Sequence, residues 1–173
     1  MIETITIREL SPADAEEFWT LRLKGLKEEP RAFTASYEEA AGESLAAVAK
    51  RLESSDNGFL LGSFDNGKLI GVTGFYRYHD GLKVKHKGVI WGVYLLPEYR
   101  GKGIARKLLL EVIEKCKKVP GIELLHLGVD PSNKAVVKLY ESVGFTKWGT
   151  ELHALKIGEQ YVDEDQMVLW MPV

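Results

Sequence analysis

The stretch from Val93 to Val112, VYLLPEYRGKGIARKLLLEV, most constrains how this chain folds. Its first four residues are apolar, as in a buried strand, and Pro97 ends that strand because proline has no N–H for a sheet ladder. Apolar residues then recur at helical spacing from Leu109 to Cys116. A basic, glycine-rich turn joins the two parts, so we predict a strand followed directly by a long helix.

The turn between these elements has the features of an anion site. A helix that begins after such a turn presents unpaired backbone N–H groups at the positive end of its dipole. Gly101 and Gly103 carry no side chain that would keep a phosphate away, and Arg100, Lys102 and Arg106 add positive charge. The alternative is a tight turn with a solvated basic face. We favour the phosphate site, although the spacing fits neither of the common nucleotide-binding glycine patterns.

The rest of the chain predicts strands and helices that together make an α/β fold. Asn66-Gly67 marks a hairpin between two β-rich runs, and Gly158 lies in the loop between two closing strands. The order of elements, β-α-α-β-β-β-α-β-α-β-β, predicts a single mixed, mostly antiparallel twisted sheet of about seven strands, flanked on both faces by about four helices. Further elements are expected as follows: a strand at Ile5–Ile7, helices after Ser11-Pro12 and through Leu45–Leu52, a strand from about Val84 to Leu96, the strand IELLHLGV and the helix SNKAVVKLYESV.

Length and composition predict one domain, residues 1–173, with an ordinary core: 45% of the residues are hydrophobic and 28% are charged. The start of the chain lacks the apolar run of a signal peptide, and no stretch is long and apolar enough to cross a membrane, so we expect a cytoplasmic protein. The net charge of −2 argues against nucleic acid as a partner. The single cysteine, Cys116, cannot form an internal disulfide.

Two segments resemble the motifs of one known family. Arg100-x-x-Gly103-x-Ala105 matches the Arg/Gln-x-x-Gly-x-Gly/Ala signature of the GNAT superfamily of acyl-CoA-dependent N-acyltransferases. The later segment DPSNKAVVKLYESVGF is similar to the family's second hallmark, in which an Asn precedes a short helix that ends in Leu-Tyr-x-x-x-Gly-Phe. The motifs cover about Val93 to Phe145, and the predicted order of elements agrees with the family along the whole chain.

The resemblance implies a function and a set of site residues. It implies transfer of an acetyl group from acetyl-CoA to a primary amine of a small molecule or peptide, by direct attack and without a metal. It also implies that the backbone of Val93 and Leu95 pairs, as in a strand, with the pantetheine amides. Asn133 matches a cofactor contact, and Tyr140 matches the acid that protonates the leaving thiolate. The pyrophosphate would be held at the turn and first helical residues: Arg100, Gly101, Lys102, Gly103, Ile104, Ala105 and Arg106.

Several of these residues have simpler interpretations. Tyr140 is also placed to serve the apolar side of its helix, and Asn133 is also placed to be the helix N-cap, a role that Ser132 or Asp130 would fill instead. Cys116 invites a covalent acetyl-thioester mechanism, but it lies on the apolar stripe of its helix, and we favour a buried structural role.

The general base and the acceptor are less constrained. Many family members carry a glutamate on the strand before the pyrophosphate turn, yet KHKGVIWGVYLL has no carboxylate. His86, His126 and Glu98 remain as candidates, and a water chain would also serve, so we name no base.

Aromatic and acidic residues near the first helix would suit a cationic amine, although at least two of the glutamates are better explained as solvated charges. The residues concerned are Trp19, Phe33, Tyr37, Trp91, Glu28, Glu29, Glu38 and Glu39, and the closing hairpin adds a weak hint in Tyr161, Asp163, Glu164 and Asp165. The resemblance leaves a homodimer open. A non-catalytic acyl-CoA sensor and a purely structural domain are the competing interpretations.

Overall fold

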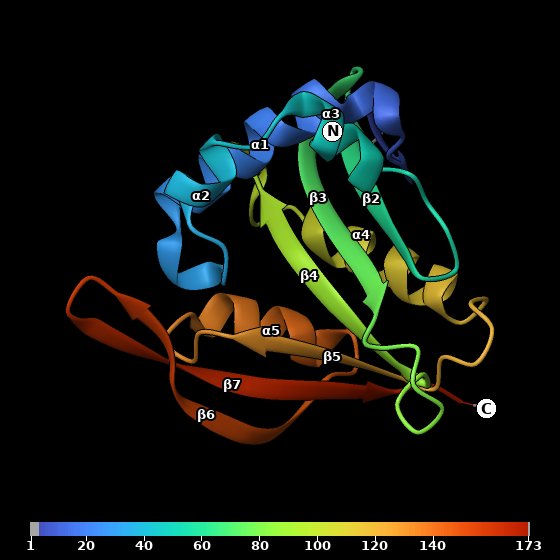
Figure 1. The fold of residues 1–173 in the computed structure, drawn as a ribbon, viewed down its shortest axis with the longest axis vertical. Helices are drawn as coiled ribbons and strands as arrows, with labels where there is room; N and C mark the ends of the chain where they lie inside the picture. Colours follow the sequence, from blue (N-terminus) through green and yellow to red (C-terminus); the bar gives the residue numbers. More distant parts are fainter. Residues whose placement is uncertain (1–3, 173) are drawn as a thin grey trace.

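The computed structural model describes residues 4–172 as an arrangement built on one seven-stranded sheet (Figure 1). The strand order is β1-β2-β3-β4-β5-β7-β6, and every neighbouring pair is antiparallel except β4 and β5. The predicted mixed, mostly antiparallel sheet is therefore confirmed. The strands are β1 Ile5–Glu9, β2 Gly58–Asp65, β3 Lys68–Arg77, β4 Lys87–Leu95, β5 Leu124–Val129, β6 Thr146–Ile157 and β7 Gln160–Trp170.

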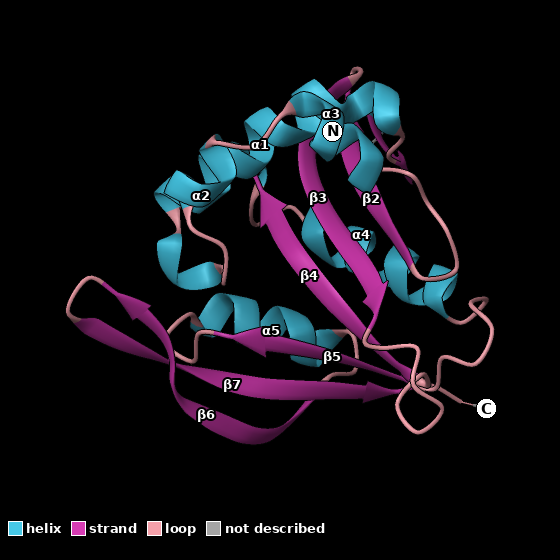
Figure 2. Ribbon diagram, viewed as in Figure 1, coloured by secondary structure: helices cyan, strands magenta, loops and turns pink. Residues whose placement is uncertain are grey.

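Helices lie on both faces of this sheet, as predicted (Figure 2). The α-helices are α1 Ala15–Glu28, α2 Tyr37–Ala41, α3 Leu45–Arg51, α4 Ile104–Cys116 and α5 Lys134–Ser142. Short 3-10 helices within the described residues include η2 Pro12–Asp14, η3 Pro30–Ala32 and η4 Pro97–Tyr99. One apolar core packs α1 and α3 against the sheet, and a second core packs α4 and α5 against the opposite face. No helix within residues 4–172 is both long enough and apolar enough to cross a membrane.

The beginning of β4 differs from the sequence prediction. A strand was expected from about Val84, whereas β4 begins at Lys87. Val84 donates its backbone N–H to the Gly81 carbonyl at 2.9 Å, and Lys87 donates to the Val84 carbonyl at 3.1 Å. These local turn bonds take the groups that a strand would offer to its neighbours, so the ladder starts three residues later.

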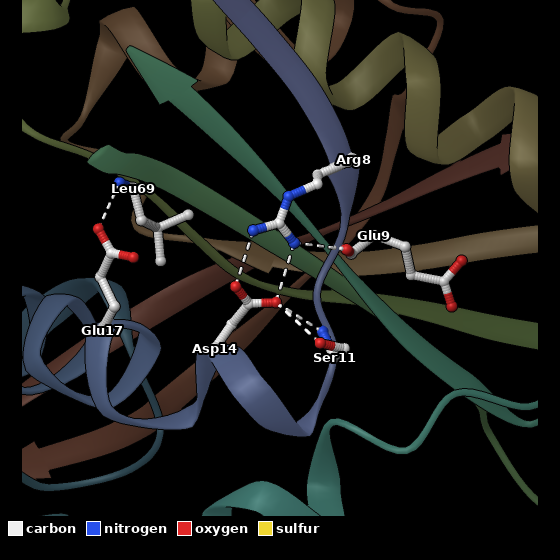
Figure 3. Close-up of polar contacts among 6 residues, drawn as sticks. All are labelled: Arg8, Glu9, Ser11, Asp14, Glu17 and Leu69. Atoms are coloured by element: carbon white, nitrogen blue, oxygen red, sulfur yellow. Dashed lines mark hydrogen bonds and ion pairs between the residues drawn. The ribbon is translucent and has the colours of Figure 1, made fainter. Parts of the chain in front are cut away.

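Polar contacts fix the start of α1 to the sheet (Figure 3). Arg8 on β1 donates two hydrogen bonds to the Asp14 carboxylate, at 2.9 and 2.7 Å, and the same carboxylate accepts from the Ser11 backbone N–H at 2.8 Å. One turn later, Glu17 accepts the N–H of Leu69 on β3 at 2.7 Å, beside a bulge in the β2–β3 ladder. Because α1 is held at both points, its inner face has a fixed position over β3 and β4.

The Arg8–Asp14 pair makes stability depend on pH in a defined direction. The Arg8 guanidinium lowers the pKa of Asp14 to about 2, below its ordinary value of 3.8, so the pair contributes fully above about pH 4 and is lost as the pH falls toward 2. We expect Asp14→Asn to lower the free energy of unfolding at pH 7 by about 1–2 kcal/mol, a modest amount because half of the Arg8 side chain is exposed.

Urea unfolding from pH 7 to pH 3 measures this effect. The difference between wild type and Asp14→Asn should stay constant down to about pH 4 and then narrow. Asp56→Asn is the control, because exposed Asp56 makes no side-chain hydrogen bond or ion pair with the described residues. A difference that widens in acid would contradict the assignment.

Candidate active site

β4 and β5 pair over only three residues and then separate. The parallel register joins Lys87–Val89 to Leu124–His126, while both strands continue beyond these residues. Figure 1 shows the two strands together near the C-terminus and diverging toward their arrowheads. The cause is visible in the β3–β4 register, where Val72 faces Tyr94 but Gly74 faces Trp91, so β4 carries one extra residue. A bulge of this kind bends a strand away from its neighbour.

The bulge contains a backbone conformation that favours glycine. Gly92 has φ +65, within the left-handed region. Beyond the bulge, Leu96 donates its N–H to Ile70 on β3 at 2.9 Å. Strand alternation therefore turns the backbone groups of Leu95 toward the opposite edge, where β5 has already diverged. The Leu95 carbonyl accepts a hydrogen bond from Arg100 Nε at 2.9 Å.

The start of α4 leaves its N–H groups without a side-chain cap. Gly101 and Gly103 have φ +74 and +78, and a Cβ on either would have no heavy atom within 4 Å, so the space beside the loop is open. Arg100 donates its N–H to the Pro97 carbonyl at 3.1 Å, and the next amide to bond back is that of Lys107, to the Gly103 carbonyl at 3.0 Å. By contrast, side-chain oxygens of Ser36, Ser44 and Asn133 cap α2, α3 and α5.

The basic side chains of the loop turn in different directions. Arg100 forms an ion pair with Glu29 at 2.7 Å and lies over the Tyr94 ring. Lys102 donates to the Glu98 carbonyl at 2.9 Å, and Arg106 reaches the Ser142 carbonyl at 3.5 Å. Backbone carbonyls do not neutralise Lys102 and Arg106, so two positive charges remain beside the open amides. The charge of Arg100 is instead paired with Glu29, which follows α1.

Tyr140 is buried on α5 in the core shared with α4. Its ring packs edge-on against Phe145 at a centroid distance of 6.1 Å, and burial raises its pKa well above the ordinary value of 10. The phenol is therefore protonated at neutral pH. Its hydroxyl makes no hydrogen bond with the described residues. The hydroxyl oxygen nevertheless keeps some contact with solvent. It is thus available to a ligand.

Asn133 is itself the N-cap of α5, contrary to the alternative that Ser132 or Asp130 would fill this role. Its side-chain oxygen accepts the Val136 N–H at 3.3 Å. Asp130 is engaged elsewhere, because it accepts hydrogen bonds from Ser132 and pairs with Arg31 at 2.7 Å. The capping oxygen of Asn133 is occupied, which leaves its amide NH2 for any ligand contact.

The acidic residues expected to receive an amine are largely engaged. Glu28 pairs with Lys24 and accepts a hydrogen bond from the Tyr94 hydroxyl, while Glu29 pairs with Arg100. Glu39 closes the N-cap of α2 with Ser36. The expectation of an acidic site for a cationic amine is therefore not supported by the charges around α1.

Two of the four aromatic residues expected near the acceptor, Phe33 and Trp91, lie beside a cation that the sequence did not predict. The Arg22 guanidinium lies 4.9 Å from the Phe33 ring centre and 5.3 Å from that of Trp91. Tyr37 lies under Lys27 instead, and Trp19 donates its ring N–H to the Ala40 carbonyl at 3.2 Å. A signal did exist, because Arg22 follows Phe18 by one helical turn and so lies on the buried stripe of α1.

The candidate bases do not gather at the divergent edge of β4. His126 packs against Trp148 at 6.2 Å, and burial lowers its pKa. His86 precedes β4, where its carbonyl accepts the Glu123 N–H at 2.9 Å, and Glu98 is exposed in η4. In the described part of the chain, no three His, Cys, Asp or Glu side chains come together as a metal site.

Comparison with known proteins identifies relatives. Residues 18–145 match the model of the acetyltransferase (GNAT) family. An L-methionine sulfoximine/L-methionine sulfone acetyltransferase of Salmonella typhimurium is 34% identical over 91 residues, half of each chain. The chain spans half or less of the length of the first curated relatives that it matches.

Solved structures agree along almost the whole chain. An acetyltransferase of the GNAT family from Streptococcus pneumoniae superposes with a TM-score of 0.78 at 27% identity, covering 96% of this chain and 99% of its own. A putative acetyltransferase from Salmonella typhimurium, solved with its cofactor acetyl-CoA, has a TM-score of 0.80 at 22% identity, covering 98% of this chain and 95% of its own. The second likeness establishes the fold only.

The position of Cys116 predicts a thiol that does not act as a nucleophile in the folded protein. Its side chain is fully buried at the end of α4, and burial raises its pKa to about 12. We expect the native protein at pH 8 to react with a disulfide reagent such as DTNB at least about 100-fold more slowly than the unfolded chain, because only the thiolate reacts. One thiol should then titrate in denaturant. Rapid reaction of the native protein would contradict this buried, unreactive state.

Proposed function

Because the chain belongs to the acetyltransferase (GNAT) family, we propose that it is an acetyl-CoA-dependent N-acetyltransferase acting on a primary amine of a small molecule or peptide. The observation that carries this proposal is the open, uncapped start of α4 beside the separated edge of β4. The relative named for acetylating a methionine derivative supports a small-molecule acceptor.

In this proposal the pyrophosphate of acetyl-CoA binds at residues 100–106. The free N–H groups of α4 and the positive end of its dipole favour an anion, and glycine at 101 and 103 leaves room for it. Lys102 and Arg106 add positive charge, while Arg100 donates a hydrogen bond to the Leu95 carbonyl. Ile104 and Ala105 contribute backbone only.

The pantetheine arm then runs back along β4. The backbone of Leu95 faces the edge that β5 has left, and Val93 lies in the bulge next to Gly92. An arm that pairs with these residues places the thioester near the bulge, at the opposite end of the separated edge from the pyrophosphate loop. The amide NH2 of Asn133 is proposed as a further contact with the cofactor.

The reaction needs a proton taken from the amine and one given to the thiolate. The neutral amine attacks the thioester carbonyl carbon, the C–N bond forms and the C–S bond breaks, and the thiolate takes a proton from Tyr140, which burial keeps protonated and which regains its proton from solvent. Solvent water removes the proton from the amine, because no carboxylate lies on β4. Direct transfer agrees with the burial of Cys116.

The loop assignment predicts a difference between two glycine variants, one at the start of α4 and one in the turn that follows the helix. Gly103 and Gly121 have φ +78 and +75, and a Cβ added at either position would have no heavy atom within 4 Å. Gly103→Val and Gly121→Val should therefore lose similar intrinsic stability, on the order of 1–2 kcal/mol, from left-handed backbone strain. Saturating acetyl-CoA should raise the melting temperature of wild type by several degrees.

The two variants should then respond differently to acetyl-CoA. Gly121→Val should keep the rise seen in wild type, whereas Gly103→Val should lose most of it because its side chain blocks the phosphate. Differential scanning fluorimetry with and without acetyl-CoA measures both. Equal rises in the two variants would place the pyrophosphate elsewhere.

Tyr140→Phe should lower turnover by about 10²-fold while leaving acetyl-CoA affinity within about twofold, because it removes a proton donor and little else. The measurement is release of free CoA thiol from acetyl-CoA across a broad panel of amines. Tyr76→Phe is the matched control, since Tyr76 is also a phenol whose pKa is raised by burial but lies on β3.

The same assay tests the proposed function. Thiol release that depends on an amine supports an acetyltransferase. Binding of acetyl-CoA without thiol release for any amine would instead indicate a sensor. Unchanged turnover in Tyr140→Phe would remove the acid assignment but not the activity.

A further inference from the structure

Arg22 differs from the other six arginines of the described chain. Each of the others makes a hydrogen bond or ion pair through its guanidinium, with partners that include Asp14, Asp130, Glu43 and Glu29. Arg22 makes neither with any residue from 4 to 172, and its Nη1 atom is sealed from solvent without a partner. Its Nε and Nη2 atoms are not sealed, so one side of the guanidinium is open.

The surroundings of Arg22 do not compensate its charge. Its guanidinium lies over the rings of Phe33 and Trp91, and burial lowers its pKa to about 10, helped by the nearby positive charge of Arg51. An unpaired buried cation is costly, and stacking on two rings offsets part of that cost. No carboxylate of the described residues pairs with Arg22, and Glu28 and Glu29 at the end of the same helix pair instead with Lys24 and Arg100. The site therefore lacks an anion.

The position of Arg22 relates it to the reaction, provided that the proposed function holds. A Cβ on Gly92 would lie 3.4 Å from Arg22 Nη1, which puts the guanidinium beside the β4 bulge. In the proposed binding mode the thioester lies at this bulge, because the pyrophosphate binds at the other end of the separated edge. Arg22 thus faces the reactive end of acetyl-CoA from the α1 side of the sheet, where Trp91 packs.

We propose that Arg22 binds a carboxylate of the acceptor, and that the acceptor is accordingly an amino acid rather than a simple amine. A guanidinium offers a planar pair of donors that matches a carboxylate, and contact with aromatic rings holds that plane in place. A carboxylate on Arg22 leaves the amine of the same molecule near the bulge, where the acyl carbon lies. The unpaired cation thereby selects the chemical class of the substrate.

A role on the thioester itself predicts a different result. A cation that stabilised the thioester oxygen would accelerate transfer to every amine equally. A carboxylate-binding arginine acts only on acceptors that carry the carboxylate. Pairs of acceptors that differ only in this group therefore separate the two roles.

The experiment compares the L-amino acids with their own primary amides in the thiol-release assay, leaving out proline, which is a secondary amine, and cysteine, whose own thiol would be counted. Wild type should prefer acids over amides in kcat/KM by about 10- to 100-fold, the range for a hydrogen-bonded charge. The amine of the amide is less basic, so more of it is neutral and reactive near pH 7. This difference favours the amide and therefore works against the expected preference. Wild-type protein that acetylates amides as well as acids would overturn the proposal.

Arg22→Gln should abolish the preference by slowing the acids and leaving the amides unchanged. Arg51→Gln is the matched control, because Arg51 also lies over a tryptophan ring but is paired with Glu43, and it should keep the preference. An equal loss for acids and amides in Arg22→Gln would overturn the carboxylate role. The acetyl-CoA-induced rise in melting temperature verifies that each variant is folded.

Failure of the proposed function gives a separate result. If no acceptor releases thiol, the enzyme assignment fails, and calorimetry of the CoA-saturated protein then decides about Arg22. Heat of binding for an amino acid but not for its amide, lost in Arg22→Gln, would support the carboxylate site. Equal heats for acid and amide, or none for either, would overturn it.

Discussion

The three-residue pairing between β4 and β5 is the constraint on which the rest of the site depends. A longer parallel ladder would bury the backbone groups of Leu95 against β5 and leave no edge for a ligand. The bulge at Gly92 bends β4, while antiparallel ladders on either side keep both halves of the sheet intact. An unpaired edge invites pairing with another chain. Here the unpaired edge of β4 lies inside the sheet, between two cores that helices cover. Only a narrow, extended molecule is able to reach this edge and pair with it.

The distribution of charge reinforces this geometry. The chain is slightly acidic, and most of its arginines are paired with nearby carboxylates. The positive features without such partners include the amides at the start of α4, with Lys102 and Arg106 beside them, and the Arg22 guanidinium. They lie toward opposite ends of the free edge of β4. A bound pair of substrates that is anionic at both ends and reactive in the middle is complementary to this arrangement.

Local features of the sequence predicted much of this fold. The hairpin at Asn66-Gly67 and the strand, turn and helix around Gly103 follow from residues close together in the chain, so turn and helix rules reach them. The direction of Arg100, which pairs with Glu29, did not follow from these rules. Neither did the absence of a hydrogen-bond or ion-pair partner for Arg22 among the described residues. Side-chain pairing between distant segments is a tertiary property, and spacing alone does not encode it.

The missing carboxylate on β4 is easier to understand once Arg22 is considered. A free carboxylate beside an amine favours the protonated, unreactive ammonium form. Pairing that carboxylate with a guanidinium cancels its charge and lowers the pKa of the amine. An amino acid bound through Arg22 would therefore release its proton more readily to water than the same molecule in solution. The arginine would then do by electrostatics part of what a basic side chain on the strand does elsewhere, and the strand has no need of a glutamate of its own.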